Sequence, residues 1–368
     1  MKQVRVAILG ATGMVGRRFL SLLIHHPWFK ITVLAASPAS VGKTFFDAVR
    51  QKGLDNGELV RLDEAMRDTQ DVCEIRLMDA ADVAGIAPQV DLVFCALKLP
   101  AETIRQLEEA YARAEVIVVS NNSAHRWTPD VPIMIPELNA SHTQVIPAQR
   151  QRLDPRRGFI VAKPNCSIQS FVPPLHALWD LSPCRVLVST YQAVSGASRT
   201  LAGWHEIHDN VIPFIKGEEE KTETEPLKIW GQVDGIKIVP ASTIKISAQC
   251  VRVPVSDGHL ATVSVLFADR QPSFGDIVSR WVDFSPATQG LDLPSAPQPM
   301  LNYLEDEDRP QTRLDRDQGN GMAISVGRLR PDPVWHWKFV CLSHNTIRGA
   351  AGGAVLTAEM LVKQGWLD

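Results

Sequence analysis

Short apolar runs alternate with amphipathic stretches along the first third of the chain. The runs have the length and β-branched content of buried strands, and the stretches between them have the three- and four-residue spacing of helices. We predict strands at Val4–Leu9, Ile31–Ala36, Glu74–Met78, Leu92–Leu97 and Val116–Ser120, and helices at Met14–His25 and Ala101–Arg113. Strands that alternate with helices are typical of βαβ units on a parallel sheet, so this part predicts an α/β domain.

The pattern changes at the polar, basic segment Ala148–Arg157, which we interpret as a domain boundary. Beyond it, strands follow one another through turns, which is typical of a mixed or antiparallel sheet in an α+β domain. We predict strands at Phe159–Ala162, Arg185–Val194, Ile236–Val239 and Leu260–Phe267, a hairpin of Ala323–Gly327 with Val334–Cys341, and helices at Ser167–Trp179 and Thr346–Val362. The proline-rich segment Ser285–Pro310 predicts a long surface excursion.

The composition agrees with a globular protein of two domains. A chain of 368 residues is longer than one core usually organises, and 45% hydrophobic and 21% charged residues are ordinary values. The net charge of −3 excludes a global field that would recruit nucleic acid or an acidic membrane. The six cysteines lack CxxC pairs and zinc-like spacing, and we find no leader or membrane-spanning run. We therefore predict a cytoplasmic protein without a disulfide framework or a metal site.

A glycine-rich turn follows the first predicted strand and precedes the first predicted helix. Residues 10–16 read GATGMVG, a GxxGxxG pattern. Glycines permit a tight turn and close approach of the backbone, and the helix N-terminus offers unpaired N–H groups to a pyrophosphate. The turn therefore predicts a dinucleotide site, the alternative being that its glycines only close a tight turn. The residues expected to hold the cofactor are Gly10, Thr12, Gly13, Met14, Val15 and Gly16.

The residues after the second predicted strand indicate which dinucleotide binds. A site for NAD carries Asp or Glu there, which binds the ribose 2′-hydroxyl. This chain has Ser37, Ser40 and Lys43 and no carboxylate between Ala35 and Lys43, which suits a 2′-phosphate. We therefore predict NADP over NAD; the alternative is that these small residues form a plain surface loop.

Cys166 has the sequence context of a reactive cysteine. It lies in Lys163-Pro164-Asn165-Cys166-Ser167, between a predicted strand and the start of a predicted helix. A helix N-terminus stabilises a thiolate and lowers the pKa of the thiol. The other cysteines are interpreted as packing residues, and the alternative is that Cys166 is one as well.

A second candidate segment places Arg252 and His259 seven residues apart, with Pro254 and Gly258 between them to prevent a regular helix. A lone histidine is usually structural. In one pocket with Cys166, however, His259 would act as general base with a pKa near neutrality, and Arg252 could bind a carboxylate through two hydrogen bonds. The inference needs a fold that joins these residues.

Seven motifs occur in a fixed order along the chain. They are GATGMVG (10–16), SNNSAHR (120–126), PNCS (164–167), QAVSGAS (192–198), DNVIPFIKGEEEK (209–221), RVPVSDGH (252–259) and HNTIRGAAGGA (344–354). Together they resemble the aspartate-β-semialdehyde dehydrogenases, particularly the archaeal and fungal branch, over nearly the whole chain. The resemblance implies an NADP-dependent, reversible reductive dephosphorylation of L-aspartyl-4-phosphate to L-aspartate-4-semialdehyde through a cysteine thioester. This step belongs to the biosynthesis of lysine, through diaminopimelate, and of threonine, methionine and isoleucine.

The resemblance also implies the fold and the partners. It implies an N-terminal Rossmann-like domain that binds NADP, and an α+β catalytic and dimerisation domain of the glyceraldehyde-phosphate-dehydrogenase type. Because the C-terminal helix is expected to return to the first domain, the expected domains are residues 1–157 with 343–368, and residues 158–342. The expected partners are a small-molecule substrate and inorganic phosphate, in a homodimer or a dimer of dimers.

The matched motifs imply a role for each residue of the candidate site. Cys166 matches the nucleophile, His259 the acid/base group, and Gln192 the residue that orients the intermediate. The residues implied to bind substrate or phosphate are Arg252 for the α-carboxylate, Glu218 for the α-ammonium, Lys221 and Arg126 for phosphate, and Asn165. Those implied to bind the cofactor are Ser195, Gly196 and Asn345, the last at the nicotinamide.

Some of these assignments have plain alternatives. The stretch from Glu218 to Lys221 has the composition of a solvated charged segment, and Arg126 could be an ordinary surface arginine. The choice of Glu218 over Glu219 rests on its spacing of three from Lys221.

Two departures from the family pattern keep other functions open. Lys163 stands where a small or neutral polar residue, often Asn, precedes Pro-Asn-Cys, and a cation there can depress the thiol pKa or alter the affinity for phosphate. Ser198-Arg199-Thr200 replaces an expected Gly-Tyr-Pro, and the added arginine could favour a bulkier anionic substrate. The alternatives are a malonyl- or succinyl-CoA reductase on the same fold, and a non-catalytic NADP-binding regulatory protein.

Overall fold

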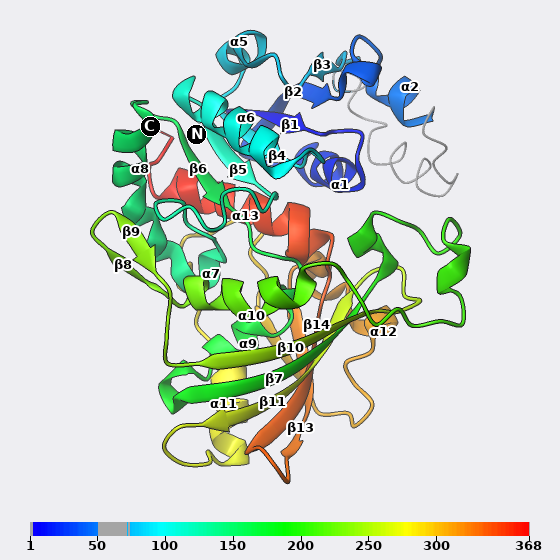
Figure 1. Ribbon diagram of the computed structural model, residues 1–368, viewed down its shortest axis with the longest axis vertical. Coiled ribbons are helices and arrows are strands. Elements are labelled where there is room, and N and C mark those ends of the chain that lie inside the picture. The colour runs from blue at the N-terminus through cyan, green and yellow to red at the C-terminus, as the bar shows by residue number, and fades with distance from the viewer. Residues whose placement is uncertain (1–2, 51–71, 73, 368) are drawn as a thin grey trace.

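A computed structural model describes residues 3–50, 72 and 74–367 and contains two large sheets, each with helices packed against it (Figure 1). The first sheet has six parallel strands in the order β3-β2-β1-β4-β5-β6. They are β1 Val4–Leu9, β2 Phe29–Ala36, β3 Met78–Asp79, β4 Leu92–Cys95, β5 Ile117–Ser120 and β6 Phe159–Ala162. The strand order changes direction between β1 and β4, and ligands bind such sheets beyond the carboxyl ends of the strands at this point.

Helices cover both faces of the first sheet. α1 (Met14–Leu23) and α13 (Gly352–Lys363, red in Figure 1) pack on one face, where Phe19, Phe94 and Leu356 share a core. α6 (Ala101–Arg113) and α8 (Ile146–Leu153) pack on the other face through residues such as Tyr111 and Leu153. The shorter helices are α2 Phe45–Arg50, α5 Val83–Ile86 and α7 Pro136–Asn139. Because both faces are covered, the strands are continuous apolar runs in the sequence.

The second sheet is mixed, with six strands in the order β10-β7-β11-β14-β13-β12. They are β7 Pro183–Gln192, β10 Lys245–Arg252, β11 His259–Phe267, β12 Leu301–Leu304, β13 Ile324–Pro331 and β14 Trp337–Ser343. One face packs on α9 (Val172–His176) and α11 (Phe274–Val282), whereas the other face of β7 exposes Leu187 and Tyr191. The remaining elements are α10 Glu218–Ile229, α12 Thr312–Asp315 and the two-stranded hairpin β8 Gln232–Asp234 with β9 Lys237–Val239. No helix within the described ranges is long and apolar enough to cross a bilayer.

Strand pairing in the second sheet brings three predicted site residues to one end of it. β10 runs parallel to β7, and Arg252 is the partner of Gln192. β11 runs antiparallel to β7 and begins at His259, one residue before Leu260, which pairs with Tyr191. Gln192, Arg252 and His259 therefore lie at the ends of three adjacent strands.

One strand beyond the predicted domain boundary after residue 157 pairs within the first sheet. β6 pairs with β5, so Phe159–Ala162 belongs to the first sheet, and the chain leaves that sheet only at Lys163. The polar segment that suggested the boundary is largely α8, a helix that buries only a few of its residues against the same sheet. A mostly polar composition therefore marked a surface helix within the first domain.

Three other segments differ from the sequence predictions. The helix expected over Ser167–Trp179 is divided into the 3₁₀ turn Ser167–Gln169, α9 and a second 3₁₀ turn, because consecutive prolines fit only the first turn of a helix. The expected excursion Ser285–Pro310 contains β12, which pairs with β13. The strand expected over Glu74–Met78 is found only as β3, from Met78.

Candidate active site

Cys166 lies in the loop that leaves the first sheet after β6. The backbone N–H of Asn165 donates to Oε2 of Glu225 at 2.7 Å, and that of Ser167 donates to the Asn165 side chain at 3.0 Å. The helix expected after Cys166 is a single 3₁₀ turn, which is too short to provide a large dipole. The expected low pKa is therefore absent: burial, and then the carboxylate of Glu218, raise the pKa of the Cys166 thiol to about 11.

His259 lies beside the sulfur. Its Nε2 is 3.5 Å from Sγ of Cys166. Its other ring nitrogen, Nδ1, accepts the backbone N–H of Ala193 at 3.1 Å, so the neutral ring carries its proton on Nε2 and directs it at the sulfur. The pKa is not near neutrality as expected, because burial and then the charge of Arg252 lower the pKa of His259 to about 3. In this conformation His259 is a hydrogen-bond donor to the sulfur, not a base.

The other strand ends add groups of both charges beside the nucleophile. Arg252 donates from Nη1 to the carbonyl oxygen of Ala193 at 2.7 Å, and Gln192 donates from Nε2 to Oε1 of Glu218 at 3.0 Å. A Cβ on Gly196 would lie 2.7 Å from Nη1 of Arg252, so the turn of Gly196 packs closely against the guanidinium. The structure thus brings a buried cation and a buried carboxylate together at the end of the sheet.

The first turn of α10 distinguishes the two candidate glutamates. Glu218 is buried, contacts Gln192 and has its Oε2 3.8 Å from Nζ of Lys221. Glu219 is exposed and accepts the backbone N–H of Cys250 at 3.2 Å, at the edge of the sheet. Glu218 is therefore the carboxylate that faces the candidate site.

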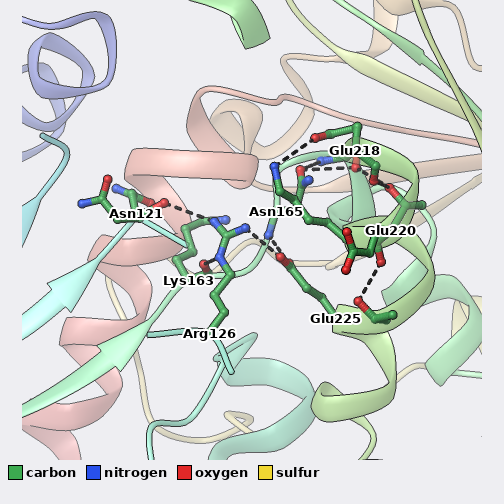
Figure 2. Close-up of polar contacts among 12 residues, drawn as sticks. Asn121, Arg126, Lys163, Asn165, Glu218, Glu220 and Glu225 are labelled. Atoms are coloured by element: carbon green, nitrogen blue, oxygen red, sulfur yellow. Dashed lines mark hydrogen bonds and ion pairs between the residues drawn. The ribbon is translucent and has the colours of Figure 1, made fainter. Parts of the chain in front are cut away.

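Arg126 enters the same region from the first domain. Its guanidinium donates to Oε1 of Glu225 at 2.8 Å and to the carbonyl oxygens of Lys163 and Asn121 at 2.9 and 3.1 Å (Figure 2). Glu225 lies on α10, four residues after Lys221, which is about one helical turn. The two cations predicted to bind phosphate therefore both lie at α10: Lys221 is part of the helix, and Arg126 is bound to it through the ion pair with Glu225.

The glycine-rich turn has the geometry of a phosphate-binding loop. Gly10 has a φ of +89°, and a Cβ there would lie 2.7 Å from the carbonyl oxygen of Ala96; a Cβ on Gly16 would lie 2.2 Å from that of Gly10. α1 begins at Met14, and its N-cap residue, Gly13, has no side chain that could cap the first turn. Its N–H groups can therefore meet an anion. The remaining predicted loop residues are Gly13 as the N-cap, the buried Thr12, and Val15 in the first turn of α1.

The three residues predicted to select NADP share the loop after β2. Ser37 is exposed, Ser40 is buried at the end of a short 3₁₀ turn, and Lys43 donates from Nζ to the carbonyl oxygen of Ala39 at 3.0 Å. The glycine-rich turn adjoins this loop, since the N–H of Gly10 donates to the carbonyl of the β2 residue Ala35 at 2.8 Å. Two hydroxyls and an ammonium thus lie beside the predicted pyrophosphate site.

Asn345, predicted to contact the nicotinamide, connects two turns at the candidate site. Its Oδ1 accepts the backbone N–H of Gly258 at 2.8 Å, and its Nδ2 donates to Oγ of Ser195 at 2.9 Å. It therefore fixes the turn of Ser195 against the residue that precedes His259.

Two family models match the chain, one over each domain. The model described as semialdehyde dehydrogenase, NAD binding domain, matches residues 5–146, and the model described as semialdehyde dehydrogenase, dimerisation domain, matches residues 172–348. The chain belongs to the semialdehyde dehydrogenase family. The resemblance that the seven motifs predicted is confirmed.

Relatives within the semialdehyde dehydrogenase family match this chain over nearly its full length. The aspartate-semialdehyde dehydrogenase of Archaeoglobus fulgidus is 44% identical over 359 residues, 98% of each chain, and that of Schizosaccharomyces pombe is 40% identical over 366 residues, also 98% of each. The solved structure of aspartate semialdehyde dehydrogenase with NADP from Candida albicans superposes with a TM-score of 0.85 at 35% identity, covering 99% of this chain and 100% of that one. The predicted fold class is confirmed.

The sequence analysis missed two α10 residues that hold this semialdehyde dehydrogenase site together. Glu225 binds Arg126 and the loop of the nucleophile, as described above. Lys228 donates from Nζ to the carbonyl oxygens of Arg126, Thr128 and Val131 at 2.7, 2.8 and 2.8 Å. Spacings of three and four residues along α10 place such side chains on one face of a helix, and that spacing was the available signal.

Removing the Lys228 ammonium is expected to destabilise the protein. Lys228→Met leaves three carbonyl oxygens, mostly buried, without their donor, and we expect the free energy of unfolding to fall by about 2–4 kcal/mol. Urea denaturation measures this difference. Lys216→Met, at an exposed lysine before the same helix, is the matched control and is expected to change stability by less than about 0.5 kcal/mol. Equal losses in the two variants would contradict the role given to Lys228.

Proposed function

We propose that this chain is an NADP-dependent aspartate-semialdehyde dehydrogenase, which reductively dephosphorylates L-aspartyl-4-phosphate to L-aspartate-4-semialdehyde and catalyses the reverse reaction. The observation that carries the proposal is the approach of Cys166 Sγ to His259 Nε2 at 3.5 Å, with Arg252 and Glu218 at the same end of the sheet. The names of the full-length relatives support it.

The charges at the site suit an amino acid substrate. Arg252 can bind the α-carboxylate through two charge-assisted hydrogen bonds, and Glu218 can bind the α-ammonium. Gln192 holds the Glu218 carboxylate by a hydrogen bond of 3.0 Å. An acyl-CoA of a simple dicarboxylic acid has no ammonium to offer Glu218. It would leave this buried carboxylate with only the hydrogen bond from Gln192 and the 3.8 Å contact with Lys221, which disfavours the acyl-CoA reductase alternative.

The first chemical step makes a thioester. The Cys166 sulfur attacks the acyl carbon of aspartyl phosphate and gives up its proton, the carbon–oxygen bond to phosphate breaks, and phosphate leaves with the electron pair and takes up that proton. Arg126 and Lys221 are the cations proposed to bind that phosphate. In the reverse direction the same two side chains hold inorganic phosphate as it attacks the thioester.

The glycine-rich turn fits the pyrophosphate of NADP, because only glycine fits at Gly10 and Gly16. The two hydroxyls and the ammonium of Ser37, Ser40 and Lys43 fit its 2′-phosphate. Bound NADPH supplies the hydride that reduces the thioester carbon.

Two donors can stabilise the negative oxygen that develops during reduction. The Nε2–H of His259 points toward the sulfur, and the backbone N–H of Cys166 belongs to the same residue as the sulfur. The carbon–sulfur bond then breaks, its electron pair returns to Cys166, and the aldehyde leaves. No net proton transfer is needed in this collapse, so a neutral His259 that only donates a hydrogen bond is sufficient.

A substrate assay tests the proposal. The purified protein is expected to form NADPH, followed at 340 nm, from aspartate semialdehyde, inorganic phosphate and NADP, with no rate when phosphate is omitted. NADPH oxidation with malonyl-CoA or succinyl-CoA, and no turnover of aspartate semialdehyde, would replace the proposal by the acyl-CoA reductase alternative. Binding of NADP with no turnover of any of these substrates would leave the regulatory-protein alternative.

Lys43→Glu tests the proposed preference for NADP. Because a charge-assisted contact to the 2′-phosphate is replaced by repulsion, we expect the Kd for NADP to rise about 10–100-fold, with little change for NAD. Fluorescence titration of both dinucleotides measures the two affinities, and Lys30→Glu, at an exposed lysine of β2, is the matched control. An unchanged Kd for NADP in Lys43→Glu would reject this assignment.

We also propose that the protein forms a homodimer or a dimer of dimers through the outer face of the second sheet. The strands in question lie within the region matched by the dimerisation-domain model, and Leu187 and Tyr191 expose apolar surface there. Light scattering of the purified protein gives the oligomeric mass, and a monomer at micromolar concentration would contradict the proposal.

A cytoplasmic location stays a prediction.

A further inference from the structure

A buried lysine lies behind the nucleophile, and the proposed reaction gives it no part. Lys163 is 2% exposed, and its Nζ donates to the carbonyl oxygen of Gly349 at 2.6 Å. Gly349 belongs to the π-helical turn Ile347–Ala351 that precedes α13. A Cβ on Gly349 would lie 2.8 Å from Cβ of Cys166. The residue whose carbonyl accepts the hydrogen bond of the Lys163 ammonium therefore packs directly against the nucleophile.

The carboxylates of this region already have other cations beside them, and Oε2 of Glu218 lies 3.8 Å from Nζ of Lys221. Glu225 pairs with Arg126 at 2.8 Å, and Glu137 pairs with Arg348. In the part of the chain that the structure describes, no ion pair is recorded for Lys163, and its one recorded hydrogen-bond acceptor is the carbonyl of Gly349. A buried ammonium without a counter-ion is costly, so an anion close to it gains stabilisation.

Lys228, the other buried lysine described for this site, has a hydrogen-bond acceptor for every N–H of its ammonium. Lys228 donates to three carbonyl oxygens, one for each of its N–H groups. Lys163 has one such acceptor. Three carbonyl oxygens accept hydrogen bonds from the Lys228 ammonium and stabilise its charge. One carbonyl oxygen does so for Lys163, whose positive charge has no anionic partner among the described residues.

The electrostatics of Lys163 identify the nucleophile as the opposing charge. Burial lowers the pKa of Lys163 to about 7. Among the neighbouring charges, the Cys166 thiolate opposes this most strongly and Glu225 opposes it less, whereas Arg348 and Arg126 lower the pKa further. Conversely, the Lys163 ammonium lowers the pKa of Cys166, against the effects of burial and of Glu218.

We propose that Lys163 is a positioning residue for the reaction: its ammonium is the buried counter-charge of the Cys166 thiolate and stabilises this nucleophilic form against the protonated thiol. Arg252 and Arg126 also lie near the sulfur, but each has another anion to bind. The substrate carboxylate neutralises Arg252, and Glu225 neutralises Arg126. Lys163 is therefore the cation that still opposes the thiolate when the substrate is bound.

His259 and Lys163 stabilise the sulfur of Cys166 in different ways. His259 is neutral and donates one hydrogen bond to the sulfur, so it contributes no net charge. Lys163 contributes the charge. Its ammonium is bound to the carbonyl of Gly349, the residue that packs against Cys166, and makes no hydrogen bond to the sulfur in the described part of the chain.

The test measures the pH dependence of the alkylation of Cys166 by iodoacetamide, read by mass spectrometry of the peptide that contains it. The thiolate is the reacting form, so the midpoint of the rate profile reports the pKa of Cys166. We expect Lys163→Met to move this midpoint upward by about one pH unit and to slow alkylation at pH 7 about tenfold. Lys163→Gln keeps a donor for the Gly349 carbonyl but removes the charge, and is expected to give the same shift.

Lys228→Met is the matched control, because it removes a buried ammonium from the same site and destabilises the fold. Lys228 is not among the groups with the largest effects on the pKa of Cys166, so the alkylation profile of Lys228→Met is expected to stay within about 0.3 pH units of the wild type. Each profile is measured on protein that retains NADP binding and a cooperative unfolding transition.

Three results would overturn the proposal. They are an unchanged midpoint in a folded Lys163→Gln protein, a shift in Lys163→Met that Lys163→Gln does not share, and an equal shift in Lys228→Met. The second would assign the effect to the hydrogen bond with Gly349, and the third to general loosening of the site. If Lys163→Met does not fold, Lys163→Gln alone decides. The proposal rests on the proposed function only in taking Cys166 as the nucleophile, and alkylation needs no substrate, so an inactive dehydrogenase assay and an unchanged alkylation profile are separate failures.

Discussion

Cys166→Ser is expected to lower kcat with aspartate semialdehyde by about 10⁴-fold or more, while the Kd for NADP stays unchanged. A serine hydroxyl is far harder to deprotonate than a thiol, and the ring nitrogen that faces it, Nε2 of His259, already carries a proton. His259 is therefore not placed to take the proton of the hydroxyl. Turnover is followed by NADPH absorbance at 340 nm, and cofactor binding by fluorescence titration.

Cys184→Ser is the matched control for this experiment. Cys184 lies near the start of β7, at the end of the strand opposite Gln192, and is half-buried. Its replacement is expected to leave kcat within about twofold of the wild type. Residual activity above about 1% of the wild-type value in Cys166→Ser would contradict the thioester route.

Arg252→Leu is expected to lower kcat/KM for aspartate semialdehyde by about 10³-fold, because a buried, charge-assisted contact with the α-carboxylate is lost. The Kd for NADP is expected to stay the same. The substitution also removes a charge that lowers the pKa of His259, so that pKa is expected to rise toward its ordinary value. Steady-state kinetics with aspartate semialdehyde measure the main effect.

A substrate without the carboxylate separates recognition from structure. Arg252 also donates to the carbonyl of Ala193, so its loss could disturb the turn that holds His259. With 3-aminopropanal, the ratio of wild-type to Arg252→Leu activity is expected to fall close to one, and Arg252→Lys is expected to recover part of the activity with aspartate semialdehyde. An equal loss with both aldehydes would mean that Arg252 supports the turn and does not read the carboxylate.

The cofactor end of the site could be predicted from the sequence because it is local. Strand, glycine-rich turn and helix follow one another within residues 4–23, and Gly10 and Gly16 each have a steric reason to be there that a reader of the sequence can anticipate. The loop of Ser37, Ser40 and Lys43 follows the next strand in the same way. Local order along the chain determines both features.

The reactive end depends on pairing between distant segments. Gln192, Arg252 and His259 meet because β7 pairs in parallel with β10 and antiparallel with β11, and nothing in the three segments themselves specifies these partners. The motif resemblance supplied that step. The burial of Lys163 was equally hidden, since its acceptor is the carbonyl of Gly349, 186 residues further along the chain.

The error about the acidity of Cys166 came from applying a rule for helix N-termini to a segment that forms no regular helix. A cysteine that follows a strand and precedes a predicted helix was expected to gain acidity from the helix N-terminus. The prolines after Phe171 end that helix after one 3₁₀ turn, and burial then dominates the pKa of Cys166. The charge that opposes this burial comes from side chains whose contacts the sequence does not reveal.

The place of α13 in the fold has a consequence for how the protein is made. α13 is synthesised after every strand of the first sheet, yet it fills the core that contains Phe19, Phe94 and Val119. This face of the sheet must therefore stay open to water, or be shielded by other proteins of the cell, until α13 has been synthesised. The residues just before α13 bring Asn345 to Ser195 and Gly349 to the nucleophile. A ribosome that stops before Asn345 releases a chain with an open apolar face and without these two contacts, whereas a chain that includes α13 closes the core and makes both.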